Sequence, residues 1–154
     1  MERPVLRTFG WLPLVTIVVA VGHILTCYAG LPALVPSHFN LAGWPDAYSR
    51  KATLFILPGV VLALDLLLGF IGRHPEWGNY PVEVTEHNRE RLHTQFRALL
   101  LTTRVLMALT LNSMAILTVE IARHRLERLN PVWIGVCVAA LLIGTLTSAW
   151  RMRR

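Results

Sequence analysis

One polar stretch of the chain, VPSHFNLAGWPDAYSRK at residues 35–51, concentrates side chains that could bind a ligand. Histidine, asparagine and aspartate supply hydrogen-bond donors and acceptors there, and a lysine adds a positive charge. The same side chains could instead satisfy the backbone of their own turn, which would make residues 31–52 a packed cap. Both interpretations stay open. The candidate ligand-binding or partner-binding residues are His38, Phe39, Asn40, Gly43, Pro45, Asp46 and Lys51.

The backbone of this stretch is expected to be ordered. Pro32 and Pro36 each fix their own φ and restrict the residue before them, which favours an extended exit from the preceding apolar segment. Gly43 can adopt a left-handed conformation, and the W-P-D sequence that follows it is typical of a rigid turn leading into the next helix. The residues therefore predict an ordered loop between two apolar segments.

A second set of polar side chains lies inside apolar segments, where an ionisable group is costly and normally faces a partner. Asp65 and Arg104 would lie about 10 Å below the same membrane surface, so we predict that they pair across two antiparallel helices. We interpret the pair as a structural lock. The alternative function is a small transporter or ion-pathway subunit that uses Asp65, Arg104 and His23. Asn112 lies near the middle of its segment.

His23 also suggests a third function. It lies below the 31–52 loop and could join His38 and Asp46 around a zinc ion in a metal-dependent membrane enzyme. These three residues lack the close i, i+4 spacing of strong metal motifs, and the chain has no nucleophile elbow, HExxH motif or P-loop. We therefore expect a protein that is not an enzyme, with no catalytic residue, no metal and no cofactor.

Membrane-spanning helices would position these residues. The chain of 154 residues has a mean hydropathy of +0.50 and is 54% hydrophobic, with its apolar residues in long blocks. A block of about 20 apolar residues is long enough to cross a bilayer. We predict an all-α integral membrane bundle of four helices, forming a single membrane domain over residues 1–154. The spans are expected at about 11–29, 53–72, 98–121 and 132–150.

Basic residues predict the orientation of this bundle. They lie between and after the apolar blocks, where they fix topology and meet anionic headgroups, so we expect lipid rather than nucleic acid as their partner. The outer side would hold Arg50, Lys51, Arg123, Arg125 and Arg128. The inner side would hold more, namely Arg3, Arg7, Arg73, Arg89, Arg91, Arg97, Arg151, Arg153 and Arg154. This excess predicts that both termini are cytoplasmic and that the 31–52 loop faces outward.

The connection between the second and third spans ends in an amphipathic segment. Thr85 is a suitable N-cap, and Glu86 would lie in the first turn, where the helix dipole favours a negative charge. Leu92, Phe96 and Leu99 then recur at helical spacing, with charged residues on the other faces. We predict a short helix at the inner membrane surface that runs into the third span, with a solvated helical extension as the alternative.

Two motifs, in order along the chain, resemble a known family. The first consists of Leu31-Pro32, Pro36, His38-Phe39-Asn40, Gly43, Pro45-Asp46, Tyr48 and Lys51, followed by Pro58. The second consists of Asn79-Tyr80-Pro81-Val82, Val84-Thr85-Glu86, Asn88 and Gln95-Phe96-Arg97. Together they cover about residues 30–100. They resemble the DUF1648 family of small bacterial membrane proteins, which includes the amino-terminal part of SdpI-type immunity proteins.

The resemblance implies a role in immunity or signalling. SdpI-like members protect a cell from an exported killing peptide and help to hold a transcriptional repressor at the membrane. We therefore expect a protein of the bacterial inner membrane whose 31–52 loop recognises an exported peptide or a partner membrane protein. The basic segment near residues 89–97 would be the cytoplasmic face that meets lipid or a regulator. A homo-oligomer is a further option that the sequence leaves open.

Overall fold

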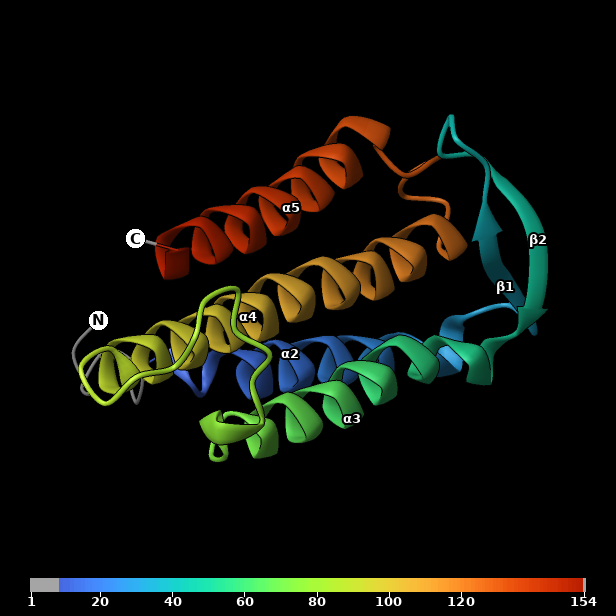
Figure 1. Cartoon of the computed structure of the whole chain (residues 1–154). Coiled ribbons are helices and arrows are strands. Elements are labelled where there is room, and N and C mark those ends of the chain that lie inside the picture. The colour runs from blue at the N-terminus through green and yellow to red at the C-terminus, as the bar shows by residue number, and fades with distance from the viewer. Residues whose placement is uncertain (1–8, 154) are drawn as a thin grey trace.

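The computed structural model describes residues 9–153, which form four long helices and a small β-hairpin (Figure 1). All four helices are long and apolar enough to cross a bilayer, so the chain is a multi-pass membrane protein and the predicted all-α bundle is confirmed. The elements are α2 (Leu12–Cys27), η1 (Tyr28–Gly30), β1 (Leu34–Phe39), β2 (Pro45–Arg50), η2 (Lys51–Phe55), α3 (Ile56–Ile71), η3 (Pro75–Trp77), α4 (Arg89–Ala122) and α5 (Pro131–Arg153).

Proline lies in the first turn of three of the long helices. α2 carries Pro13 there, α5 begins at Pro131, and Pro58 lies in the first turn of α3. Proline suits this position because its missing N–H would have no intrahelical acceptor. In contrast, α4 contains neither glycine nor proline along its 34 residues. The predicted amphipathic segment is therefore the first part of α4 and continues into the span without a break. The helix begins at Arg89 with Asn88 at its N-cap, so the predicted start at Thr85 and Glu86 is wrong.

α4 is the central helix of the bundle. α2 and α3 pack against α4 and against each other, whereas α5 packs mainly along α4 and lies away from α2 and α3 (Figure 1). Apolar side chains of α5 such as Leu142, Ile143 and Leu146 are exposed on the isolated chain. Lipid tails are as apolar as these side chains, so such a surface contacts the bilayer.

The predicted loop folds as a β-hairpin. Its strands pair antiparallel from Leu34 opposite Arg50 to Phe39 opposite Pro45, with register shifts on both sides of His38. The extended exit expected from the prolines is present as β1, but the strand pairing was not predicted. Proline cannot donate to a ladder, and an irregular register removes the strict alternation that signals a strand.

An apolar core ties the hairpin to the helices. Val35 of β1 is fully buried, and it packs with residues from α2, η2 and the last turns of α4. Burying such side chains contributes about 1.5–3 kcal/mol each. The hairpin is thus anchored to the bundle's packed interior through Val35 rather than being a free loop. The core consists of Ile24, Leu31, Val35, Leu54, Ala115, Val119 and Ala122.

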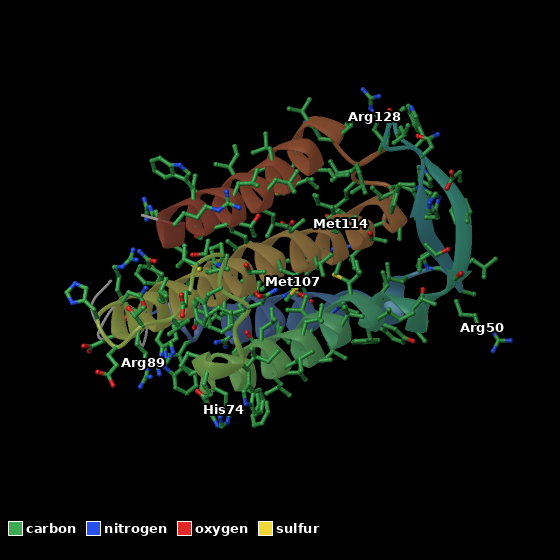
Figure 2. The ribbon with its side chains drawn as sticks, viewed as in Figure 1. Arg50, His74, Arg89, Met107, Met114 and Arg128 are labelled. Atoms are coloured by element: carbon green, nitrogen blue, oxygen red, sulfur yellow. The ribbon has the colours of Figure 1, made fainter. Side chains whose placement is uncertain are left out.

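The bundle has two distinct ends. The hairpin end comprises the hairpin and residues 123–130, and the connection end comprises residues 72–88 with the start of α2 and the end of α5 (Figure 1). Figure 2 shows Arg50 and Arg128 at the hairpin end and His74 and Arg89 at the connection end. Arg3, Arg7 and Arg154, on which the predicted orientation partly rests, lie outside the described residues.

Candidate functional site

Asn40 closes the turn at the tip of the hairpin. Its side-chain Oδ1 accepts hydrogen bonds from the backbone N–H of Ala42 at 3.0 Å and of Trp44 at 3.1 Å. Its backbone N–H donates to Trp44 O at 2.9 Å, and its carbonyl accepts from Gly43 N at 2.8 Å. Asn40 thus satisfies its own turn, as the cap interpretation expected of a polar loop residue.

Gly43 docks the tip onto the loop between α4 and α5. Its φ is +82°, and Leu129 N donates to its carbonyl at 2.9 Å. A Cβ at this position would come within 2.0 Å of Leu129 O, so only glycine fits. Arg128 lies over the Trp44 ring, with its guanidinium carbon 5.5 Å from the ring centre. The two loops of this end therefore form one unit.

His38 and Asp46 face each other across the hairpin. His38 Nδ1 lies 2.5 Å from Asp46 Oδ1, and the two side chains are 70% and 43% exposed. They are close together, as expected of candidates in one loop, and their remaining polar atoms are open to solvent. Among the residues that the sequence singled out, this pair is the polar group best placed to meet a ligand from outside the hairpin.

Lys51 fixes the base of the hairpin. Its Nζ donates to Tyr28 O at 3.0 Å and lies 4.6 Å from the centre of the Tyr28 ring. Its backbone N–H also donates to Ala33 O at 3.1 Å. These contacts hold the end of β2 against the end of α2. Lys51 therefore acts as a structural anchor in this structure rather than as a free cation.

Phe39 lines two cavities beneath the hairpin. One cavity of about 310 Å³ opens toward α3, and another of about 510 Å³ opens toward α5. Both are lined by Ser37, Phe39 and Met114, the last of which comes from α4 (Figure 2). Pro45 lines a third cavity of about 680 Å³ on another side of the hairpin. The walls of the first two cavities are mainly apolar, which suits apolar side chains of a ligand.

The predicted pair between Asp65 and Arg104 is present. Arg104 Nε donates to Asp65 Oδ1 at 2.8 Å, and Asp65 is only 3% exposed. Gly69 lies one turn from Asp65, and a Cβ there would come within 3.4 Å of the Arg104 guanidinium carbon. Because a buried carboxylate needs a cation and hydrogen bonds, this geometry fits a lock between α3 and α4.

Asn112 joins α4 to α2 in the middle of the bundle. Its Nδ2 donates to Thr16 Oγ1 at 3.0 Å, and the residue is 2% exposed. Its Oδ1 is buried and has no hydrogen-bond partner within the described part of the chain. An interhelical hydrogen bond of this kind contributes about 0.6 kcal/mol in a membrane protein. Asn112 therefore links α2 and α4 weakly, and its Oδ1 remains available as a hydrogen-bond acceptor.

His23 meets α4 rather than the hairpin. Its Nε2 lies 2.9 Å from Glu120 Oε1, so this intramembrane histidine has a polar partner on another helix. The structure does not gather it with His38 and Asp46. Instead, one ligand atom each of His23, Cys27 and Glu120 lie within 4.8 Å of one another. The i, i+4 spacing of the histidine and the cysteine in α2 was a sequence signal for this group that our prediction missed.

Two arginines complete this polar cluster. Arg123 donates to Cys27 Sγ at 3.1 Å and to Glu120 Oε1 at 3.4 Å, and Arg125 lies 3.5 Å from Glu120 Oε2. His124 follows the end of α4 and lies between them in sequence with a left-handed φ of 57°. Arg125 N then donates back to Glu120 O. Because the chain reverses there, Arg125 reaches the same carboxylate as Arg123.

The connection end carries a comparable histidine–carboxylate pair. His74 Nδ1 lies 3.0 Å from Glu76 Oε1, and the His74 ring stacks on Trp77 with the ring centres 4.4 Å apart. A backbone hydrogen bond, aided by the bond to His74, lowers the pKa of Glu76 below its ordinary value. Burial raises the pKa of Tyr80, whose hydroxyl donates to Pro75 O at 2.7 Å.

Comparison with known proteins supports the family resemblance in part. Residues 15–62 match the family described as a domain of unknown function, DUF1648. This segment includes most of α2, the hairpin and the first turns of α3, so it contains every candidate residue of the loop. The second motif, at residues 79–97, lies outside the match.

A relative of the chain is an uncharacterized protein of the archaeon Archaeoglobus fulgidus. It is 34% identical over 65 residues, which are 37% of this chain and 36% of the relative. The aligned region thus covers little more than a third of the relative's own length. No solved structure matches the chain.

Proposed function

We propose that the protein is a non-enzymatic receptor of the bacterial inner membrane whose hairpin end recognises an exported peptide or a partner membrane protein. The observation that carries the proposal is that Phe39 lines two mainly apolar cavities under an ordered, exposed hairpin. Apolar side chains of a peptide could enter these cavities while the His38–Asp46 pair meets its polar atoms.

The orientation in this proposal follows from the basic residues. The hairpin would face outward, where an exported peptide arrives, and the connection end with both termini would face the cytoplasm. The exposed first turn of α4, from Arg89, would then be available to anionic lipid or to a regulator. An immunity or signalling role is the specific form that the family resemblance favours.

Paired variants at the two ends of the bundle test the recognition function. We expect Phe39→Ala to weaken ligand or partner binding about 30-fold, because an aromatic side chain that becomes buried against a ligand typically contributes about 2 kcal/mol or more. His38→Ala and Asp46→Ala should weaken it less, since their pair is exposed. The measurement is quantitative affinity purification of the intact protein from membranes, together with protection of cells from the exported peptide.

The connection end supplies the matched control. His74 and Glu76 form the same kind of pair, so His74→Ala and Glu76→Ala should leave both readouts unchanged. If the three hairpin variants accumulate normally and retain full binding and protection, the hairpin does not recognise a ligand and is only a cap.

A second candidate function is an ion pathway. The observation in its favour is that α4 carries Arg104, Asn112 and Glu120 at eight-residue intervals, each bonded to a polar side chain of α2 or α3. Eight residues span about 12 Å of helix, so water would have to bridge successive groups. This candidate is the transporter or ion-pathway subunit that uses Asp65, Arg104 and His23. Variants of Asp65 and Arg104, assayed for both stability and proton flux, test it.

A further inference from the structure

We propose that His23, Cys27 and Glu120 form a binding site for a zinc-like divalent ion between α2 and α4, at the hairpin end. The proposal departs from our expectation that the chain binds no metal. It differs from the metal-dependent enzyme considered from sequence, which used His38 and Asp46, and it does not depend on the proposed recognition function. The site would fasten the two helices that support the hairpin.

The geometry of the three residues suits one ion. His23 and Cys27 lie one turn apart in α2, so their side chains project from the same face of the helix. Glu120 approaches from α4, and all three ligand atoms lie within 4.8 Å of one another. Ligand atoms around a tetrahedral zinc ion are about 3.5 Å apart, given bonds of about 2.0–2.3 Å. Small side-chain adjustments would therefore bring the three ligand atoms to the spacing that a zinc ion needs.

The chemistry of the three ligands selects the ion. An imidazole nitrogen, a thiolate and a carboxylate oxygen are the ligand types that zinc accepts, and three protein ligands leave a fourth position open. Magnesium and calcium prefer oxygen ligands alone, so the cysteine argues against them. Binding transfers the thiol proton of Cys27 to water as the sulfur–metal bond forms, and the metal keeps its oxidation state.

Arg123 shows that these ligand atoms already converge on a positive charge. Its guanidinium donates both to Cys27 Sγ and to Glu120 Oε1, the two ligands that would carry negative charge. Arg125, the other cation on Glu120, is 61% exposed and has room to move into solvent. The arginines thus compete with a metal ion for the same atoms. Removing Arg123 should strengthen metal binding, whereas a purely structural ion pair gives no such gain.

Titration of the purified full-length protein with Co²⁺ tests the site, because a cobalt–thiolate bond has a characteristic absorption band. We expect one ion per chain, displaced by Zn²⁺. Cys27→Ser should abolish the thiolate band. It should also weaken Zn²⁺ binding by more than the loss of a residue that only supports a ligand does, which costs roughly 10–100-fold. Arg123→Gln should raise the affinity about tenfold, since it removes a nearby positive charge.

Two controls separate the site from general effects. Cys137→Ser removes the other cysteine, which lies on α5, and should leave the band and the affinity unchanged. Arg128→Gln removes a cation of the same end that does not contact the three ligands, and should also change nothing. The proposal is wrong if wild-type protein shows no thiolate band, if Cys137→Ser loses the band, or if Arg123→Gln binds Zn²⁺ no more tightly than wild type.

Discussion

The two ends of the bundle differ in how their carboxylates are paired with arginines. Toward the connection end, Asp65 meets Arg104 one to one, and the carboxylate is almost fully buried. At the hairpin end, Glu120 shares its carboxylate with Arg123 and Arg125, whose side chains are 30% and 61% exposed. The first arrangement has no spare charge and holds two helices together. The second has an excess of cations near water, so it can exchange partners.

The two ends also differ in how their loops are held. The hairpin is fixed by strand pairing, by the Gly43–Leu129 contact and by the apolar core around Val35. The connection end is mainly turns, held by contacts such as the Tyr80 hydroxyl on Pro75 O. Rigid elements position binding groups more precisely than loops do. This difference in rigidity favours the hairpin end as the place of the proposed recognition.

The largest effect on stability is expected from breaking the buried ion pair. Asp65→Asn leaves Arg104 without its counter-charge inside the bundle, which should destabilise the protein by about 3–5 kcal/mol. Glu120→Gln at the other end should cost less, because this carboxylate is less deeply buried than Asp65 and its partner Arg125, which is 61% exposed, can turn to water. Unfolding of the purified protein in mixed micelles, followed by circular dichroism, measures both changes. If Asp65→Asn and Glu120→Gln lose equal stability, the two ends do not differ in how strongly their charges hold the bundle.

A double variant separates the lock from an ion pathway. Replacing both partners, as in Asp65→Leu with Arg104→Met, should restore most of the stability, because no charge is left unpaired. Proton flux into proteoliposomes is the second readout. We expect the wild type to move no more protons than empty liposomes do. A wild-type flux that the folded double variant lacks would favour the ion pathway over the lock.

The next largest effect is expected at the tip of the hairpin. Gly43→Ala places a Cβ against Leu129 O and forces a left-handed φ on alanine, at a cost of about 1–3 kcal/mol. The tip should separate from the 123–130 loop, and ligand binding should weaken while α3 and α4 stay packed. Hydrogen exchange resolved by residue should show faster exchange at Leu129 N, whose acceptor is Gly43 O.

Gly30 provides the matched control for this substitution. A Cβ at Gly30 would have no non-neighbouring atom within 4 Å, so Gly30→Ala should leave exchange in the hairpin unchanged. If Gly43→Ala also leaves it unchanged, the contact between the two loops does not order the hairpin.

The helices and the Asp65–Arg104 pair could be predicted because each depends on local sequence. Long apolar runs can be recognised from composition alone. The equal depth of the two charges follows from the helical rise of each span. The hairpin was missed because Pro36 and Pro45 interrupt the strand pattern and the register shifts around His38. Its tip is also held by docking to Leu129. That docking is a contact between distant parts of the chain, which local sequence does not encode.

The polar groups of the candidate site were predicted only in part. His38 and Asp46 do meet, but His23 turns to Glu120, a residue 97 positions away that the sequence placed only near the end of a span. Cys27, which lies one turn after His23, was not among the residues that the sequence singled out. Arg123 could not be assigned to this cluster in advance, because its position depends on how α4 ends.

The central claim is that the hairpin end faces outward to receive a ligand. A membrane-impermeant maleimide applied to intact cells tests it most directly. The protein would carry Cys27→Ser and Cys137→Ser together with either Ala47→Cys in the hairpin or Glu86→Cys in the connection, both at exposed positions.

We expect the Ala47→Cys variant to be labelled in intact cells and the Glu86→Cys variant to be labelled only after the membrane is opened. The reverse pattern would place the hairpin in the cytoplasm and contradict recognition of an exported peptide.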